Sequence, residues 1–204
     1  VNSDDEYFYV NSYSWPEHGM GIGITSWQEQ VPIPQNYTGD NSWRIPLNPK
    51  MAVNPVDTSV NLFRGAIAIA INGIPIFNAL NNRGENAFEE GELDNWGGHF
   101  GRGDDYHYHM IPLHLEELVG TNQPLAYGLD GFPIYGLTDS DLDQAFGRFD
   151  ENGSYRYHAS LNSPYYMPYV VGEINIVDDE ISPQPSQNPI RPSDTFKAVS
   201  GASI

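Results

Sequence analysis

Three histidines whose spacing suits a metal site lie close together in the sequence, at His99, His107 and His109. Successive side chains of an extended strand point to opposite faces, so His107 and His109 would share one face and the tyrosines around them the other. A glycine-rich loop, residues 100–103, would let His99 fold back over that strand. Three imidazoles with a spare coordination position are typical of catalytic zinc sites, and imidazole also suits copper and iron. We therefore predict a transition-metal site here.

Asp94 is the acidic residue that we predict to act beside this cluster. It belongs to an acidic segment, residues 78–95, most of whose charges we interpret as a solvated face. The sequence around Asp94 recurs around Asp143. This recurrence favours a specific role for Asp94 as a metal ligand, as a hydrogen-bond partner of a ligand, or as the catalytic base. The sequence carries no Ser-His-Asp order, P-loop or dinucleotide motif.

Two further histidines are secondary metal candidates. His114 starts a predicted short helix after Pro112. The spacing from Gly101 to His114 is similar to the first metal motif of cupins, with His in place of the usual Glu. However, Pro112 interrupts the strand that a cupin would continue, and the second cupin motif is missing. The other candidate, His158, ends a second copy of the histidine strand.

The alternation of Asp139, Asp141 and Asp143 resembles the start of a calcium-binding loop. It lacks the glycine and the distal glutamate at EF-hand spacing. Calcium is therefore a secondary prediction beside the interpretation of this segment as an exposed acidic turn.

The chain contains an internal repeat. Residues 93–109 and residues 142–158 align without a gap, and each segment ends in a Tyr-x-Tyr-His strand. Upstream of each lies an apolar strand, an Asn-Gly or Asp-Gly turn and a second strand, at residues 71–77 and 129–135, which is a strong hairpin signal. We predict two hairpin–loop–strand units related by an approximate two-fold axis within one domain.

The second unit differs from the first at the histidine positions. Arg148 and Arg156 stand where the first unit has His99 and His107, and only His158 is kept. We therefore predict that the second unit binds no metal alone. Because an unpaired buried charge is costly and Arg pairs well with carboxylates, we also predict an ion pair for Arg156. Its expected partners are Asp143 or Asp150.

These motifs resemble the YHYH-domain family over about Phe63 to Gly172. The shared features are the Gly-x-Pro-x-Phe/Tyr hairpins, the run Asp130–Gly136, the Gly98-His99 pair and the strand Tyr106–His109. The resemblance implies a secreted or envelope protein of bacteria that binds a metal through its histidines. It leaves the reaction open, because the family is largely uncharacterised. Family members often repeat Gly-His in the second half, where this chain has an arginine.

Length and composition fit one mainly β domain with few short helices. Among 204 residues there are 20 Gly, 16 Pro and 39% hydrophobic residues, which suffices for a core and is typical of a loop-rich β protein. The predicted parts are an N-terminal β arm at residues 1–60 packed on the core, a core domain at 61–177 with repeats at about 63–112 and 125–170, and a Pro- and Ser-rich tail at 178–204.

The net charge of −18 limits the kinds of molecule that the protein can bind. It repels nucleic acid and anionic membrane surfaces, so cations or neutral molecules are expected, and no sequence run has the length of a transmembrane helix. The chain has no Cys, which excludes disulfides and thiol catalysis. It begins at Val1 without an apolar leader, as a mature secreted protein would, so we expect an extracellular or periplasmic location.

Two classes of function follow. The first is an extracellular metalloprotein whose histidines hold copper, zinc or iron and which acts as a hydrolase or an oxidase. The second is a non-catalytic secreted module for adhesion, assembly or carbohydrate contact, with a structural metal and exposed Trp15, Trp27 and Trp43 as anchors. The matching partners are a small molecule, an extracellular polymer or a second copy of the chain.

Overall fold

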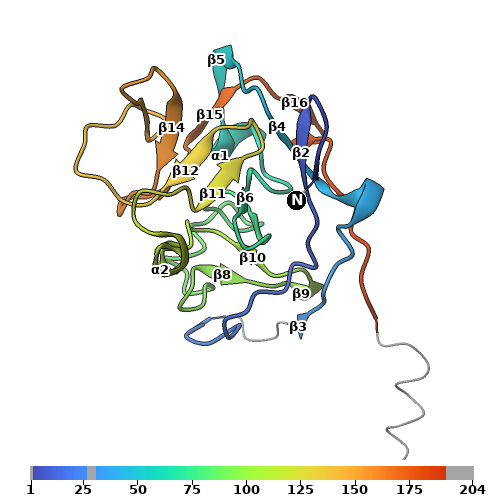
Figure 1. The fold of residues 1–204 in the computed structure, drawn as a ribbon. Coiled ribbons are helices and arrows are strands. Elements are labelled where there is room, and N and C mark those ends of the chain that lie inside the picture. The colour runs from blue at the N-terminus through green and yellow to red at the C-terminus, as the bar shows by residue number, and fades with distance from the viewer. Residues whose placement is uncertain (1, 27–30, 192–204) are drawn as a thin grey trace, which may run out of the picture.

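The computed structural model describes residues 2–26 and 31–191, and its secondary structure is mainly strand (Figure 1). Its two described α-helices are short, α1 (Thr58–Asn61) and α2 (Glu116–Val119). Two 3-10 helices cover Gly39–Asn41 and Leu113–Leu115. The prediction of a mainly β chain with few short helices is confirmed.

The largest sheet in the described chain has eight strands in the order β13-β14-β12-β11-β6-β7-β10-β8. The strands of its first half are β6 (Ala68–Ala70), β7 (Pro75–Ile76), β8 (Gly98–His99) and β10 (His107–Tyr108). The strands of its second half are β11 (Ala126–Gly128), β12 (Pro133–Tyr135), β13 (Gly147–Phe149) and β14 (Tyr155–His158).

Strand pairing in this sheet follows the same order outward from its centre on both sides. In the middle, β6 pairs antiparallel with β11. In the first half, β6 pairs antiparallel with β7, β7 parallel with β10, and β10 antiparallel with β8. In the second half, β11 pairs antiparallel with β12, β12 parallel with β14, and β14 antiparallel with β13. Each Tyr-x-Tyr-His strand therefore lies parallel to the second strand of its own hairpin.

Each hairpin of the large sheet turns at a glycine. Gly73 and Gly131 have φ angles of +82° and +94°, a left-handed conformation that other residues rarely adopt. A Cβ atom at Gly131 would also lie only 2.7 Å from the carbonyl oxygen of Pro46. The Asn-Gly and Asp-Gly signals therefore mark the β6–β7 and β11–β12 turns.

The N-terminal residues build a smaller sheet that shares the core. Its strands are β1 (Asn2–Ser3), β2 (Tyr7–Val10) and β4 (Trp43–Pro46). Trp43 and Ile45 are buried in the same hydrophobic core as β6 and β11. Trp43 is only 3% exposed and its ring packs edge-on against Tyr37, so its prediction as an exposed anchor is wrong. Trp27 lies outside the described residues.

Three further strand pairs complete the described chain. These are β5 (Met51–Asp57) with β15 (Tyr169–Gly172), β3 (Val31–Pro32) with β9 (Arg102–Asp104), and β16 (Asn175–Val177) with β17 (Glu180–Ser182). After β17, the Gln184 side chain donates to the carbonyl of Ala66 and accepts from its N–H group, each at 2.9 Å. The start of the Pro-rich segment is thus held against the core.

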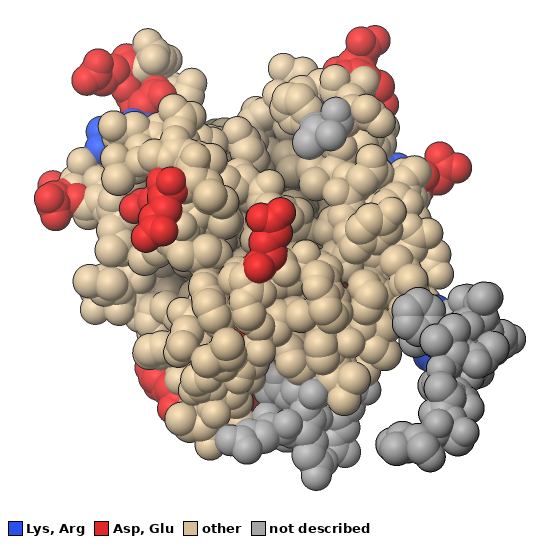
Figure 2. All heavy atoms as spheres, turned by 60° about the horizontal axis from the view of Figure 1, so that its bottom comes forward, with Lys and Arg blue, Asp and Glu red and all other residues tan. Residues whose placement is uncertain are grey.

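Acidic side chains are scattered as separate groups over the face shown in Figure 2, where few basic side chains are visible. No helix in the described part of the chain is long and apolar enough to cross a bilayer.

Candidate metal centre

His99, His107 and His109 meet at the β8 end of the large sheet. Strands β8 and β10 pair so that His99 lies opposite His107. The ring centroids are 4.8 Å apart for His99 and His107, 4.7 Å for His99 and His109, and 5.0 Å for His107 and His109. All three are buried, and one ring nitrogen from each lies within 4.8 Å of the other two. The structure therefore brings together the three histidines that the sequence singled out.

A backbone carbonyl oxygen orients each of these rings at its Nδ1 atom. The oxygens belong to Glu92 (3.2 Å from His99), Asp105 (3.0 Å from His107) and Asn78 (2.5 Å from His109). Because a carbonyl only accepts hydrogen bonds, Nδ1 of each ring carries the hydrogen and Nε2 keeps a lone pair. This is the arrangement that metal-bound histidines commonly use.

The Nε2 atoms of His99 and His109 lie 3.1 Å apart. Two lone pairs at this distance repel each other unless a proton or a metal ion lies between them. A shared proton would make one ring cationic, and burial lowers the pKa of both rings. Two nitrogens that each lie about 2.0–2.1 Å from a tetrahedral zinc ion are about 3.3 Å apart. The spacing thus fits two ligands of one ion.

His107 is also a buried ring with a lowered pKa. Burial lowers the pKa of His107, and its proximity to His99 lowers it further, because two neighbouring rings cannot readily both be protonated. All three rings are therefore neutral near pH 7, the form that binds metals. The Phe77 ring stacks on His107, with centroids 4.3 Å apart and planes 16° from parallel, and this contact fixes the plane of the imidazole.

The three histidines line a cavity of about 640 Å³. Its wall also includes Phe63, Phe77, Asn81, Arg83, Glu92 and Asp104. The volume lies within the range of small-molecule sites, roughly 300–1,000 Å³. Most of the lining residues are polar or charged, and Phe63 and Phe77 supply its apolar rings. A small molecule can therefore lie next to the imidazoles.

Glu92 is a residue of this site that the sequence pattern did not reveal. It belongs to the acidic segment interpreted as solvated, yet it is only 3% exposed. Its carboxylate forms an ion pair with Arg83 and accepts weak hydrogen bonds from Asn81 at 3.4 Å. Its backbone carbonyl orients His99. No sequence signal separates Glu92 from the glutamates beside it. Its place in the site depends on contacts with Arg83 and Asn81, which the folded chain brings next to it.

Asp94 is not part of the group of side chains that converge as candidate metal ligands. Each of its oxygens accepts from the Tyr106 hydroxyl at 3.0 Å. Its carboxylate also accepts from the backbone N–H groups of Gly21 (3.1 Å), Trp96 (2.9 Å) and Gly98 (3.2 Å). Asp94 is not among the residues that line the cavity. The structure therefore places it beside Tyr106 and the strand that leads into the first histidine.

His114 belongs to a separate aromatic cluster. Its ring centroid lies 5.0 Å from that of His18 and 6.1 Å from that of Tyr108. The Nε2 atom of His18 lies 2.7 Å from the Tyr108 hydroxyl, and the His18 ring stacks on Trp96 at 4.6 Å. Because Tyr108 alternates with the metal-site histidines along its strand, this cluster lies on the opposite strand face. The structure does not bring His114 to the other candidates.

Asp143 has the same contacts in the second half that Asp94 has in the first. The Tyr155 hydroxyl donates to its two oxygens at 3.1 and 2.9 Å, and two backbone N–H groups also donate to it. Among the described residues, the only group of three or more side chains that could hold a metal ion is the histidine cluster. Asp139, Asp141 and Asp143 therefore do not converge on a calcium site in this structure.

His158 lies in the second half of the sheet, at the end of β14, away from the histidine cluster. The neighbouring Arg156 does not form the predicted ion pair, because no described carboxylate pairs with it. Its guanidinium lies instead over the Tyr135 ring, 4.9 Å from the centroid. An aromatic ring already next to it in the sheet thus takes the place of the expected carboxylate.

Fold and site together define a mainly β domain with a buried three-histidine cluster at one end of its sheet. A family model described as YHYH protein matches residues 42–139, which include all three histidines. The resemblance to this family seen in the sequence is therefore confirmed. Neither a curated protein nor a solved structure matches the chain.

Proposed function

We propose that this protein binds one transition-metal ion through the Nε2 atoms of His99, His107 and His109. The observation that carries this proposal is the 3.1 Å approach of two Nε2 atoms whose rings face carbonyl oxygens with Nδ1. Imidazole ligands suit zinc and copper best here, with iron as the third candidate. Three protein ligands leave at least one coordination position for water or a small molecule.

An ion bound by three histidines supplies a Lewis acid for hydrolysis or a redox centre for an oxidase. The chain supplies the surroundings of the reacting molecule. Glu92 and Asp104 line the cavity with carboxylates that can accept a proton, and Phe77 keeps one wall apolar. For Asp94 we propose a positioning role, because it binds the N–H group of Gly98 immediately before His99.

Elemental analysis and metal titration test the metal proposal. The purified protein is expected to bind one equivalent of zinc or copper after chelator treatment and reloading. His109→Ala removes one of three ligands and should weaken this binding by about 100-fold or more. His18→Ala is the matched control, because His18 lies in the separate aromatic cluster. Two equivalents, or one equivalent that survives His109→Ala, would contradict the proposal.

A second candidate function is contact with a carbohydrate, with the metal in a structural role. The rings of Tyr13 (56% exposed) and Trp15 (50% exposed) line a groove of about 570 Å³ together with Asn11 and Asn72. Exposed aromatic faces beside amide groups suit a ligand that is apolar on its ring face and polar at its edge. Retention on an insoluble polysaccharide should be lost in Trp15→Ala. Equal retention of the variant, or none of the parent, counts against this function.

We also propose that the two halves of the large sheet arose by internal duplication. The shared pairing order supports this, as do the matching contacts of Asp94 with Tyr106 and of Asp143 with Tyr155. We also propose an extracellular or periplasmic location, which the resemblance to the YHYH-domain family implies. Fractionation of the cells that make the protein tests the location.

A further inference from the structure

The second half of the large sheet carries two arginines at the positions where the first half carries histidines. Arg148 on β13 lies directly opposite Arg156 on β14, as His99 lies opposite His107. Two like charges that face each other across an antiparallel pair destabilise the sheet. In a protein of net charge −18, nearby carboxylates would be expected to neutralise them.

No described carboxylate forms an ion pair with either arginine. The Arg156 guanidinium lies over the Tyr135 ring, and Arg148 donates through one terminal nitrogen to the Ser140 hydroxyl at 2.6 Å. The pKa of Asp150 is lowered mainly by backbone hydrogen bonds and to a smaller extent by the two arginines. The charges of both arginines thus act on the Asp150 carboxylate, yet Asp150 forms an ion pair with neither of them.

Two buried nitrogens of this cluster lack a hydrogen-bond partner among the described residues, Nε of Arg156 and Nε2 of His158. His158 is 7% exposed, and its Nδ1 lies 3.0 Å from the carbonyl oxygen of Gly136. Its Nδ1 therefore carries the hydrogen and its Nε2 is an acceptor. Burial, with a smaller effect of Arg156 and Arg148, lowers the pKa of His158 and keeps the ring neutral. Buried polar atoms without partners destabilise a protein, so both nitrogens point to a ligand.

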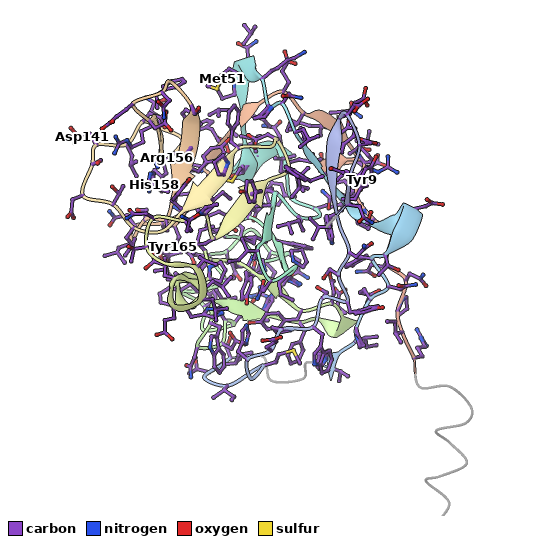
Figure 3. The ribbon with its side chains drawn as sticks, viewed as in Figure 1. Tyr9, Met51, Asp141, Arg156, His158 and Tyr165 are labelled. Atoms are coloured by element: carbon purple, nitrogen blue, oxygen red, sulfur yellow. The ribbon has the colours of Figure 1, made fainter. Side chains whose placement is uncertain are left out.

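We propose that Arg148, Arg156 and His158 bind a phosphate group. The two guanidinium groups offer charged donors to its anionic oxygens, and a P–OH hydrogen satisfies the lone pair of His158 Nε2. The Tyr135 ring covers one face of the Arg156 guanidinium and leaves its edge to donate. Figure 3 shows Arg156 and His158 beside β14, on the side of the loop that carries Asp141.

Phosphate fits this cluster better than other anions. Sulfate and simple carboxylates carry no hydrogen at neutral pH, so they would leave the His158 acceptor without a donor. Nucleic acid and other polyanions are repelled by the net charge of the chain. The ligand is therefore inorganic phosphate, or a small phosphate monoester bound as its monoanion, which keeps a P–OH hydrogen. It can enter from the solvent side, where Arg148 is half-buried and Ser140 is exposed.

Calorimetric titration in phosphate-free buffer at neutral pH tests the proposal, with inorganic phosphate and glycerol phosphate as separate probes. One equivalent of at least one probe should bind. Arg148→Gln and Arg156→Gln should each weaken it by about 10- to 100-fold, the range for losing a charge-assisted hydrogen bond. Arg44→Gln is the matched control, because Arg44 also lies over a tyrosine ring, 5.9 Å from the Tyr9 centroid, but in another sheet. Circular dichroism checks that each variant folds.

Two further measurements distinguish this site from the histidine cluster and from a general anion site. Phosphate binding should persist in His109→Ala, because that histidine belongs to the other half of the sheet. Sulfate should bind at least about tenfold more weakly than phosphate, since it lacks the hydrogen for His158. The proposal is overturned if neither probe binds saturably at millimolar concentration, if sulfate binds equally well, if Arg44→Gln costs as much as Arg156→Gln, or if His109→Ala abolishes binding.

Discussion

The Nδ1 atom of His109 lies 2.5 Å from the backbone carbonyl oxygen of Asn78, a residue 31 positions earlier in the chain. That carbonyl is itself held in place. The Asn78 side chain donates to the carbonyl of Leu62 at 2.6 Å and accepts from the N–H group of Leu80 at 2.8 Å. The orientation of a candidate metal ligand therefore depends on the loop that follows β7.

Asn78→Ala should weaken metal binding although Asn78 is not a ligand. Without its side-chain hydrogen bonds the loop can turn the carbonyl away from His109, and loss of such support typically costs 10- to 100-fold in metal affinity. Competition with a chromophoric chelator measures the effect. Asn152→Ala, in an exposed turn of the second half, should leave the affinity unchanged. Equal affinity in both variants would show that the loop does not orient the histidine.

Tyr106→Phe should destabilise the fold more than Tyr155→Phe, because Asp94 is buried whereas Asp143 is exposed to solvent. Each substitution removes the hydroxyl that donates to a carboxylate, of Asp94 or Asp143. The expected cost of Tyr106→Phe is about 1–3 kcal/mol, measured by urea unfolding, because a buried carboxylate loses a donor, whereas water can replace the lost hydroxyl at Asp143. Metal stoichiometry should stay at one equivalent in both variants. If Tyr106→Phe instead lost the metal at unchanged stability, Asp94 would act at the ion itself.

Gly98→Ala should disturb the strand that carries His99. A Cβ atom at Gly98 would lie 2.4 Å from the Tyr106 hydroxyl oxygen and 2.7 Å from the carbonyl oxygen of His107. Because one of these atoms is backbone, β8 must move away from β10, at a cost of about 1–3 kcal/mol in unfolding free energy. Gly19→Ala is the control, since its nearest neighbour is the flexible end of Ile22. The thermal unfolding temperature and the metal affinity are measured for both variants. Both quantities should fall in Gly98→Ala and stay close to the parent values in Gly19→Ala.

Asp130→Asn should change how stability depends on pH. Burial raises the pKa of Asp130 in the folded state, although the hydroxyl of Tyr157 donates to it at 2.5 Å. A raised folded pKa means that the folded protein binds more protons than the unfolded chain, so this contribution to stability is complete below about pH 3.8 and is lost as pH rises through the folded pKa. Asparagine does not titrate. Urea unfolding from pH 3 to 7 should therefore show the variant gaining stability relative to the parent as pH rises.

The sequence offers a reason to expect that Asp130→Asn folds. Asn72 occupies the matching turn position in the first half, where its amide donates to the Tyr108 hydroxyl at 3.1 Å. A stability difference between parent and variant that stays constant with pH would show that Asp130 keeps an ordinary pKa.

The histidine cluster could be predicted because its causes are local. Alternation along one strand is enough to place His107 and His109 on one face, and the glycine-rich return is enough to bring His99 back. The supports of the cluster could not be predicted in this way. Phe77 and Asn78 reach it only because β7 pairs parallel with β10, a contact between segments about thirty residues apart.

The errors have the same origin. A pattern of residue types does not tell whether an aromatic ring meets solvent or a second sheet, so Trp43 was expected at the surface and is buried. A pattern of residue types also does not tell which neighbouring group a charged side chain contacts in the folded protein. The Arg156 guanidinium contacts the Tyr135 ring on the adjacent strand and forms no ion pair with a described carboxylate.

The central pairing of β6 with β11 sets the distance between the two ends of the large sheet. Five strand-to-strand steps separate β10 from β14. At about 4.8 Å for each step, they lie roughly 24 Å apart along the sheet. Changes at this separation with no shared partners contribute independently. The combined variant His109→Ala, Arg156→Gln should therefore show the sum of the two single losses in unfolding free energy, so that each end of the domain can change its ligand without altering the other.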